Sequence, residues 1–347
     1  MTTDVLEAWG AEGQAPDMTL ATCVTPDDVR RALDVLRNVA IRTPSIESAW
    51  LSEHVGARVF LKCENLQRVG AFKFRGAYHA MSRLSEAERK RGVLTYSSGN
   101  HAQAVAHAAA LLGTRAVILM PENAPRVKLD RTTSFLESAP EGSRVQTYDP
   151  VSVSREELGR ALASDEGMTI VPPYDHPHVI AGQGTSALEL IEDVGDLDRL
   201  YVCVGGGGLL SGSAVIAKDL CDAVSVIGAE PALADDGARS FRDRVLRTVS
   251  NPATIADGAR TPYLGRHTFP LILAHVDGFV TVSEDELKAT MQIAFERLRL
   301  VIEPSGVLGL AAMLQDAGAG RLSPGAKVGV VVSGGNVDLD AVPSLLG

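Results

Sequence analysis

One lysine lies among aromatic and small residues, where its amine could be held without charge. The stretch is GAFKFRGA, residues 70–77, and it contains Lys73. A lysine in a dry pocket has a lowered pKa, and its neutral amine can attack a carbonyl carbon to form a Schiff base. Lysines beside apolar residues more often lay their stems along a surface. The stretch alone therefore favours the second interpretation, and other residues must supply the rest of a Schiff-base site.

Four consecutive glycines follow a short apolar run and precede an apolar helical pattern. They are Gly205, Gly206, Gly207 and Gly208, and Leu209 comes next. Glycine lets the backbone turn tightly and approach an anion, and the free amide groups at a helix start favour phosphate. A flexible turn is the alternative, but each glycine costs backbone entropy unless its freedom is used. The run therefore predicts a phosphate-binding loop.

The dinucleotide-binding pattern G-x-G-x-x-G does not fit the glycine run. Leu210 or Ser211 stands where the last glycine should be, and the Gly-Lys-Ser/Thr ending of a nucleotide P-loop is absent. Glu230, however, ends the next predicted strand, where a ribose-binding acid would stand. A nicotinamide-dependent oxidoreductase therefore remains open as an alternative.

Two more polar groups follow predicted strands. Ser97, Ser98, Asn100 and His101 stand where an apolar strand pattern turns into a helix. Hydroxyls, an amide and backbone donors there form a cradle for a carboxylate, although Ser98 could simply cap the helix. Ser333 follows a buried strand pattern, at the end where open α/β sheets place their ligands. A plain turn after the strand is the alternative for Ser333.

An acidic loop is the last chemical candidate. Glu230 and Asp236 bound the segment EPALADD, residues 230–236. Carboxylates at this spacing can converge with a backbone carbonyl on a hard cation such as Mg²⁺ or Ca²⁺. Solvated acids in a loop are the commoner explanation, and the spacing alone favours it.

The composition and net charge of the chain argue against some classes of protein. The chain has 347 residues, 33 basic and 43 acidic side chains, and a net charge of −10. A nucleic-acid binder needs clustered positive charge, so this balance argues against that class. The four cysteines lack the spacing of a zinc or redox motif, and no run reaches the length of a membrane span. We therefore expect a soluble cytoplasmic protein with reduced thiols.

Short apolar runs alternate with helical patterns along the chain. The predicted strands cover residues 58–62, 93–96, 116–120, 144–148, 200–204, 224–228, 279–282 and 327–332. The predicted helices cover residues 25–40, 100–112, 155–163, 182–194, 209–220 and 284–300, and another begins at Lys73. This alternation predicts an α/β fold with mainly parallel, helix-covered sheets. So many strands indicate two sheets in two domains, with the ligand between them.

The domain boundaries follow from breaks in these patterns. Residues 1–24 show no sustained period, so we expect them to form a flexible, loosely held leader. The Pro-Pro stretch at residues 171–174 is the predicted crossing between domains. Residues 25–90 and 173–347 then form a large domain, and residues 91–172 form a small one.

The chemical stretches resemble, in their order, the motifs of one enzyme family. GAFKFRGA, SSGNHAQ, GGGGLLSG and SGGNVD are similar to motifs of the fold-type II pyridoxal-phosphate (PLP) enzymes. The resemblance is greatest to the serine/threonine dehydratase and serine racemase family, which includes 3-hydroxyaspartate ammonia-lyases, and it covers about residues 25–338. It implies PLP as the cofactor and a tryptophan synthase β-like fold with the active site in the cleft between two domains.

The resemblance assigns the cofactor contacts. It implies that Lys73 holds PLP covalently and later moves the substrate's Cα proton, and that Phe72 lies against the ring. Asn100 matches the residue that hydrogen-bonds the 3-hydroxyl of the ring, and Ser333 matches the partner of the pyridine nitrogen. The segment from Gly205 to Leu209 matches the loop that binds the phosphate.

The resemblance also assigns substrate and metal contacts. Ser98 matches a hydroxyl that acts on the opposite face of Cα in racemising relatives, and Arg155 matches an arginine near the substrate. Ser97, Asn100 and His101 belong to the same substrate cradle. Glu230, the carbonyl of Ala234, and Asp236 match a site for Mg²⁺, Mn²⁺ or Ca²⁺. Gly258 and Glu303 are expected beside the ring without firm roles, and a homodimer is expected.

Two features depart from the family pattern. Residues 129–143 differ from the usual helix and Tyr-Gly-Ala turn, so we expect the small domain to be reshaped there. The chain also ends soon after Asp338, so we expect no C-terminal regulatory domain of the kind found in biosynthetic threonine dehydratases.

The reaction implied by the resemblance is β-elimination from a 3-hydroxy-L-amino acid. The products are a 2-oxo acid and ammonia. Racemisation at the same site remains open, with Lys73 and Ser98 as opposed bases, and so does an amino-acid sensor that binds PLP without turnover. The sequence leaves serine, threonine and 3-hydroxyaspartate as alternative substrates, and Arg155 could either bind a second carboxylate or pair with Glu156.

Overall fold

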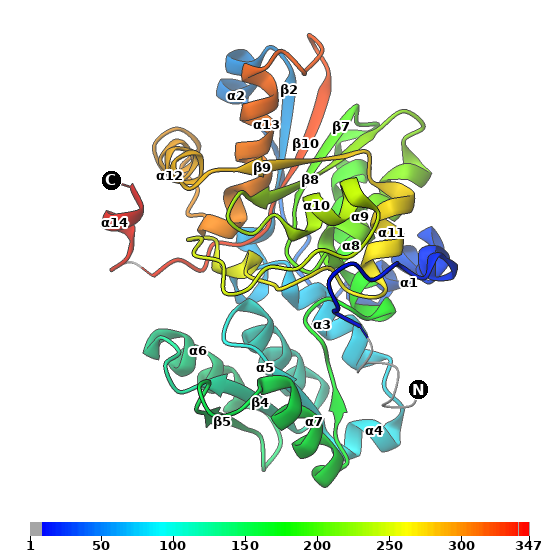
Figure 1. Ribbon diagram of the computed structural model, residues 1–347, viewed down its shortest axis with the longest axis vertical. Coiled ribbons are helices and arrows are strands. Elements are labelled where there is room, and N and C mark those ends of the chain that lie inside the picture. The colour runs from blue at the N-terminus through cyan, green and yellow to red at the C-terminus, as the bar shows by residue number, and fades with distance from the viewer. Residues whose placement is uncertain (1–8, 339, 347) are drawn as a thin grey trace.

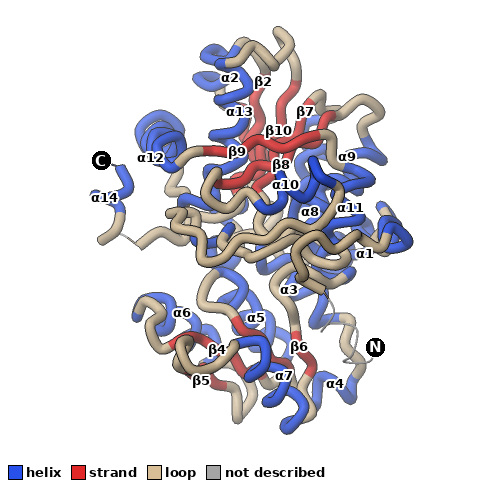
Figure 2. The backbone as a smooth tube through the Cα atoms, in the orientation of Figure 1, coloured by secondary structure: helices blue, strands red, loops and turns tan. Residues whose placement is uncertain are grey.

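The strands of the protein form two separate sheets. The structure is a computed structural model, and it describes residues 9–338 and 340–346. The larger sheet lies in the upper half of Figure 1 and the smaller sheet in the lower half, and Figure 2 shows the same separation with strands in red. The prediction of an α/β fold with mainly parallel sheets is confirmed.

The larger sheet has six strands in the order β1-β2-β10-β7-β8-β9. Their bounds are β1 Ser45–Glu47, β2 Arg58–Cys63, β7 Arg199–Cys203, β8 Ser225–Pro231, β9 Gly278–Val282 and β10 Lys327–Val332. β1 runs antiparallel to β2, and the other neighbouring pairs are parallel. The carboxyl ends of β7 and β10 therefore meet at one edge of the sheet, and the glycine run and Ser333 follow directly there.

The smaller sheet has four parallel strands in the order β5-β4-β3-β6. Their bounds are β3 Val93–Tyr96, β4 Ala116–Pro121, β5 Arg144–Tyr148 and β6 Thr169–Ile170. After β6 the chain returns to the larger part of the molecule and enters α8 (Figure 1). The segment with Pro172 and Pro173 makes this return, where the sequence predicts a crossing.

Helices cover the faces of both sheets (Figure 1). Around the larger sheet they are α1 Pro26–Leu36, α2 Ala49–Val55, α3 Lys73–Ser82, α8 Pro177–Val194, α9 Gly208–Leu220, α10 Asp236–Asp243, α11 Thr268–His275, α12 Glu284–Ile293, α13 Leu308–Gly318 and α14 Val342–Leu346. The remaining helices are α4 Glu86–Arg91, α5 Asn100–Leu112, α6 Arg126–Leu136 and α7 Arg155–Glu166. Within the described ranges, none of these helices has the length and apolar character that crossing a membrane requires.

Capping differs between α12 and α7, and one predicted helix is shorter than expected. Ser283 and Glu286 form a capping box at the start of α12, whereas Ser154 caps α7 without a reciprocal bond from Glu157. The helix expected over residues 284–300 stops as an α-helix at Ile293 and continues as a short π-helix, Ala294–Leu298. The segment whose sequence departs from the family pattern still forms a helix, because α6 covers most of it.

The expectation of a loosely held leader is wrong for residues 9–24. Trp9 packs on Phe269, and its indole Nε1 donates to the carbonyl of Leu264 at 2.9 Å. Gly13 donates from its backbone to Leu246, and Val24 is 2% exposed. This segment follows the surface and has one short 3₁₀-helix, Met18–Thr22, which is too short to show a period in the sequence. Residues 1–8 lie outside the described part of the chain.

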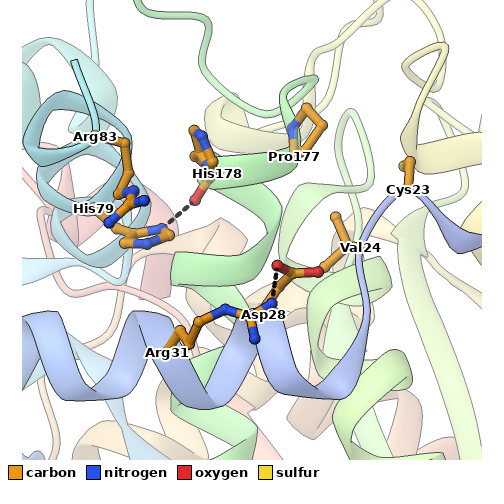
Figure 3. Close-up of a pocket in the computed structure, with 8 residues that line it drawn as sticks. All are labelled: Cys23, Val24, Asp28, Arg31, His79, Arg83, Pro177 and His178. Carbon is orange, nitrogen blue, oxygen red and sulfur yellow. Dashed lines mark hydrogen bonds and ion pairs between the residues drawn. The ribbon is translucent and has the colours of Figure 1, made fainter. Parts of the chain in front are cut away.

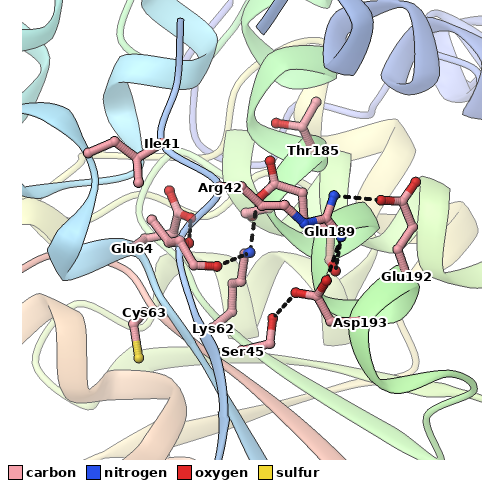
Figure 4. A network of polar contacts seen from close by, with 12 residues as sticks. Ile41, Arg42, Ser45, Lys62, Cys63, Glu64, Thr185, Glu189, Glu192 and Asp193 are labelled. Carbon is pink, nitrogen blue, oxygen red and sulfur yellow. Dashed lines mark hydrogen bonds and ion pairs between the residues drawn. The ribbon is translucent and has the colours of Figure 1, made fainter. Parts of the chain in front are cut away.

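A buried network of charges fixes α3 to the larger sheet, and Figure 4 labels three of its members, Lys62, Glu64 and Glu189. The Arg75 guanidinium donates to both carboxylate oxygens of Glu64 and of Glu189, at 2.7 to 2.8 Å. Lys62 Nζ lies 2.8 Å from Glu189 and donates to the carbonyl of Thr43 at 2.7 Å. All four charged side chains are at most 4% exposed. The network joins β2, α8 and the first turn of α3, and so holds the helix that carries Lys73.

Candidate active site

The Lys73 side chain lies at the start of α3, beside the crossing between the two sheets. Its Nζ donates a hydrogen bond to the carbonyl of Pro173 at 2.8 Å and lies 5.0 Å from the centre of the Phe72 ring. Burial lowers the pKa of Lys73 to about 8, against the opposing charges of Cys203 and Glu303. Part of the amine is therefore neutral near physiological pH, as a Schiff-base lysine requires.

The glycine run turns from the end of β7 into the start of α9. Gly207 is the N-cap residue, with a φ of +92°, and no side chain within the described residues caps the first turn. A Cβ atom at Gly206 would lie 2.3 Å from the ring of Tyr174, so no larger residue fits there. Leu209 is buried in the core below the turn. The uncapped amides of this turn fit an anion, and the binding of phosphate here stays a prediction.

The side-chain amide of Asn100 forms hydrogen bonds with two residues, Glu303 and Asn336, from the part of the molecule that contains the larger sheet. Its Nδ2 donates to Glu303 Oε1 at 2.7 Å, and its Oδ1 accepts from Asn336 Nδ2 at 2.8 Å. Burial and the charge of Asp257 raise the pKa of Glu303 to about 8, although Asn100 and Lys128 oppose the shift. The amide of Asn100 therefore has a fixed orientation, as a ring-hydroxyl partner would need.

Ser333 lies at the carboxyl end of β10 and is 2% exposed. Its backbone carbonyl accepts from the amide of Phe72 at 3.0 Å, and its hydroxyl donates to the carbonyl of Ser305 at 3.4 Å. The first bond ties the end of β10 to the residue before Lys73. Ser333 and the lysine are therefore brought together from positions 260 residues apart.

Ser98 does not cap α5. The N-cap residue of that helix is Gly99, and no side-chain bond caps it. The amide of Gly99 instead donates to the hydroxyl of Ser97 at 3.3 Å. Ser98 is partly exposed, so the capping interpretation is wrong and its hydroxyl is available for another role.

His101 lies deeper than a substrate contact would. It is 2% exposed, its Nε2 lies 3.0 Å from the carbonyl of Val171, and its Nδ1 has no partner among the described residues. Burial and the charge of Lys73 lower its pKa to about 3, so the ring is neutral. The ring packs against the crossing segment, and a direct contact with substrate stays a prediction.

Arg155 is the first residue of α7 and is about half exposed. Its Nε donates to Glu156 Oε1 at 2.6 Å, and the side chains are 46% and 41% exposed. The charge of Arg155 also acts on Tyr174, whose ring covers the glycine run. Arg155 therefore pairs with Glu156 and also acts on a residue beside the glycine run.

Glu230 and Asp236 form a buried pair of carboxyl groups. Each is 1% exposed, as is Ala234, and Asp236 Oδ2 has no partner among the described residues. Burial and the charge of Asp236 raise the pKa of Glu230, and burial raises the pKa of Asp236 to about 8. An orphaned carboxylate oxygen beside a second buried carboxyl fits a hard cation. No cluster of three or more His, Cys, Asp or Glu suited to a metal occurs within residues 9–338 and 340–346.

The Glu230 carboxylate is not placed as a ribose ligand would be. Its two oxygens accept from the amides of Gly237 at 3.2 Å and Ala238 at 2.8 Å. These bonds direct the carboxylate to the first turn of α10, where it is buried. Glu230 is therefore not available to bind a ribose, and this was the sequence feature that supported a nicotinamide-dependent oxidoreductase as an alternative.

A cavity lies at the other end of α3 (Figure 3). It has a volume of about 140 Å³ and is lined by Cys23, Val24, Asp28, Arg31, His79, Arg83, Pro177 and His178. His79 Nδ1 lies 2.8 Å from the carbonyl of His178, and burial lowers the pKa of His79 to about 4. No predicted site residue lines this cavity, so it is separate from the lysine site.

Three residues of the site carry no role in the sequence analysis. They are Tyr174 over the glycine run, Asn336 on Asn100, and Cys203 beside Ser333. Each lies in or beside a recognised stretch, since Tyr174 ends the Pro-Pro stretch, Asn336 belongs to SGGNVD and Cys203 stands two residues before Gly205. Adjacency to a motif is a signal that could have found them.

The fold and the site together define the class of protein. A partly neutral lysine, an uncapped glycine turn and a buried hydroxyl are found together in this fold, and they suit a ligand with an aldehyde, a phosphate and an aromatic ring. The chain belongs to the pyridoxal-phosphate dependent enzyme family, whose family model matches residues 36–334. The structural relatives place it among the fold-type II members of that family.

The most informative relatives are named as lyases and racemases. The chain is 48% identical over 319 residues to an L-threo-3-hydroxyaspartate ammonia-lyase of a Pseudomonas species, covering 92% of this chain and 97% of the relative. It is 46% identical over 316 residues to the serine racemase of Schizosaccharomyces pombe, covering 91% and 95%. The structure of maize serine racemase matches with a TM-score of 0.86 at 37% identity, covering 92% and 96%.

Proposed function

We propose that this protein is a PLP-dependent ammonia-lyase that converts a 3-hydroxy-L-amino acid into a 2-oxo acid and ammonia. The observation that carries the proposal is the lysine itself, whose amine is partly neutral and held by the Pro173 carbonyl beside the Phe72 ring. The similarity to two 3-hydroxyaspartate ammonia-lyases, from Pseudomonas and from Saccharomyces cerevisiae, supports the lyase assignment. Serine, threonine and 3-hydroxyaspartate are the proposed substrates.

Each part of the site has a proposed task in this reaction. The bound cofactor would supply an electron sink for the charge that develops when the Cα proton leaves. Lys73 removes that proton, and the amides of the glycine run hold the cofactor phosphate. Asn100 and Ser333 orient the ring from its two ends. Elimination of water leaves an enamine, which hydrolyses to the 2-oxo acid and ammonia.

Racemisation is the second candidate function. The uncapped, partly exposed Ser98 hydroxyl favours it, because a racemase needs a second proton carrier opposite the lysine. A panel of L-serine, L-threonine and L-threo-3-hydroxyaspartate tests both functions by the release of 2-oxo acid. Chiral analysis of the remaining amino acid separates them, since net D-serine without pyruvate would contradict the lyase proposal.

We expect Arg155 to select the dicarboxylic substrate. Replacing Arg155 with methionine should lower kcat/KM for L-threo-3-hydroxyaspartate by about 10- to 100-fold, as expected for losing one charged hydrogen bond. The value for L-serine should stay within about twofold, because serine has no second carboxylate. Arg126→Met is the matched control, since that arginine is 92% exposed. Equal losses for both substrates in Arg155→Met would show that the arginine does not read the second carboxylate.

We also propose a divalent-cation site at Glu230, the carbonyl of Ala234, and Asp236. The unpartnered Oδ2 of Asp236 supports it, because a cation would neutralise two carboxyl groups that are otherwise buried together. Mg²⁺, Mn²⁺ or Ca²⁺ at about 100 times its Kd should then stabilise the fold by about 2.7 kcal/mol over the chelated protein. Thermal unfolding with EDTA and with each cation measures the effect.

Two variants decide whether the stabilisation comes from this site. Asp236→Asn should remove the cation-dependent rise in Tm. Asp235→Asn should keep it, because Asp235 pairs with Arg239 and is partly exposed. A Tm that responds to no cation in the unmodified protein would contradict the proposed site.

The remaining proposals concern organisation. We retain the division into a large domain of residues 25–90 and 173–347 and a small domain of residues 91–172, and we propose a homodimer in the cytoplasm. The exposed apolar side chains Phe295 and Val301, at 51% and 48%, support self-association, and the free cysteines fit a reducing compartment. A monomer mass by light scattering would contradict the dimer.

A further inference from the structure

The cavity in Figure 3 lies where three helices meet. Its lining comes from the start of α1 and the two residues before Thr25, from the end of α3, and from the first turn of α8. Its volume of about 140 Å³ has room for several water molecules. Pockets for drug-sized ligands measure about 300 to 1,000 Å³, so a nucleotide is too large for this cavity. A ligand of only a few heavy atoms fits.

The polar lining carries charges of both signs. Arg31 and Asp28 pair with each other at 2.7 Å. The guanidinium of Arg83, by contrast, makes no hydrogen bond or ion pair with another residue of the described ranges. The first turn of α8, an 18-residue helix, adds the positive end of a helix dipole. An arginine without a partner beside a helix N-terminus suits a carboxylate group.

His79 adds a buried hydrogen-bond acceptor to this lining. Its side chain is 4% exposed, and its Nδ1 donates to the carbonyl of His178 at 2.8 Å, because a carbonyl can only accept. Burial lowers the pKa of His79 to about 4, so the ring is neutral and its Nε2 keeps a lone pair. Among the described residues, none donates a hydrogen bond to Nε2. A ligand with an N–H donor would supply the missing bond.

We propose that this cavity binds a small amino acid in its zwitterionic form, at a site separate from the one where the substrate reacts. The carboxylate of the ligand pairs with Arg83 near the start of α8, and its ammonium group donates to His79 Nε2 and to Asp28. A simple anion would leave Nε2 without a donor, and a simple amine would leave Arg83 without a partner. A zwitterion therefore satisfies the lining better than either of them.

The cavity shares two segments with the lysine site. α3 begins at Lys73 and carries His79 in its last turns, and the segment leading into α8 contains Pro173, whose carbonyl accepts from Lys73 Nζ. The hydrogen bond from His79 to His178 joins these two segments at the cavity. An amino acid bound there therefore contacts the helix and the segment that position the reacting amine.

Titration calorimetry with glycine on the borohydride-reduced holoenzyme tests the site. Borohydride adds hydride to the carbon–nitrogen double bond between Lys73 and the proposed PLP, so the cofactor no longer reacts with an added amine. We expect glycine to bind at one site per chain. Acetate and methylamine each keep one of its charged groups and should bind at least about tenfold more weakly, the worth of one charged hydrogen bond. Acetate that binds as tightly as glycine, or glycine that shows no saturable binding, would overturn the inference.

Two variants assign the binding to this cavity. Arg83→Met should weaken glycine binding by about 10- to 100-fold, and since Arg83 is exposed the fold should not change. Arg37→Met is the matched control, because Arg37 is 67% exposed and lies outside this cavity. His79→Phe keeps an aromatic ring without Nε2, so it should weaken the binding of glycine but not that of acetate. An unchanged affinity for glycine in Arg83→Met would refute the assignment.

The blocking step rests on the proposed PLP site, and the two possible failures can be told apart. If borohydride bleaches no visible band, the proposed function is wrong. The glycine titration still decides the inference in that case, because no aldehyde is present to react with glycine. If the band is bleached and glycine does not bind, the inference is overturned while the proposed function stands.

Discussion

Replacing Lys73 with alanine is expected to abolish the release of 2-oxo acid and ammonia. The same side chain is proposed to attach the cofactor and to move the Cα proton, so both tasks are lost at once. The loss of the proton carrier alone is expected to reduce kcat by about four orders of magnitude, the upper end for general acid–base catalysis. The absorbance band of lysine-bound cofactor should disappear as well, and both losses are measured on one preparation.

Two control variants show that these losses come from the amine. Lys73→Arg keeps the positive charge and much of the length, but its guanidinium does not form the covalent link, so it should be as inactive as the alanine variant. Lys90→Ala removes an exposed lysine, 74% accessible, and should leave activity unchanged. Turnover by Lys73→Ala at the rate of the unmodified protein would disprove the proposed mechanism.

Replacing Arg75 with methionine is expected to destabilise the fold by about 3 to 5 kcal/mol, the cost of leaving a buried ion pair without its partner. Arg75 neutralises Glu64 and Glu189, which are both buried, and the remaining Lys62 cannot balance two carboxylates. Burial of an uncompensated charge is costly, because the interior cannot solvate it. Urea denaturation followed by circular dichroism measures the change in the free energy of unfolding.

An exposed ion pair provides the matched control. Arg58 makes two hydrogen bonds to Glu47, at 2.8 and 2.9 Å, in an arrangement similar to that of Arg75 with Glu64. These two side chains are 50% and 40% exposed, so Arg58→Met should cost only about 0 to 1 kcal/mol. Similar costs for the two variants would contradict the argument from burial.

The strand and helix predictions are confirmed where a pattern of apolar residues ends sharply on both sides. β3, β5 and α5 have the predicted bounds, because Gly or Pro residues and polar turns stop each apolar pattern sharply. β6 escapes prediction because two residues, Thr169–Ile170, are too few to show a period. α13 is not predicted, because its sequence, LGLAAMLQDAG, is apolar on almost every face and so lacks the alternation of apolar and polar faces that marks an amphipathic helix.

The individual chemistry of the site is also readable from the sequence. Lys73, the glycine run and Ser333 each follow a recognisable local pattern, and their order along the chain points to a PLP enzyme of fold-type II. The substrate is harder to read, because Arg155 has the same local sequence whether it binds a carboxylate or pairs with Glu156. In the structure, Arg155 pairs with Glu156, and its charge acts on Tyr174, whose ring covers the glycine run.

The sequence by itself determined the class of fold, the candidate lysine and the loop suited to phosphate, since these depend on residues that are neighbours in the chain. The tertiary structure alone decided which distant groups these residues meet: the Lys73 amine meets the Pro173 carbonyl, and Asn100 meets Glu303. The segments involved lie 100 to 203 residues apart. The physical reason is that strand pairing and burial bring distant segments together, and no local pattern of residue types encodes which distant carbonyl, carboxyl or thiol will be met.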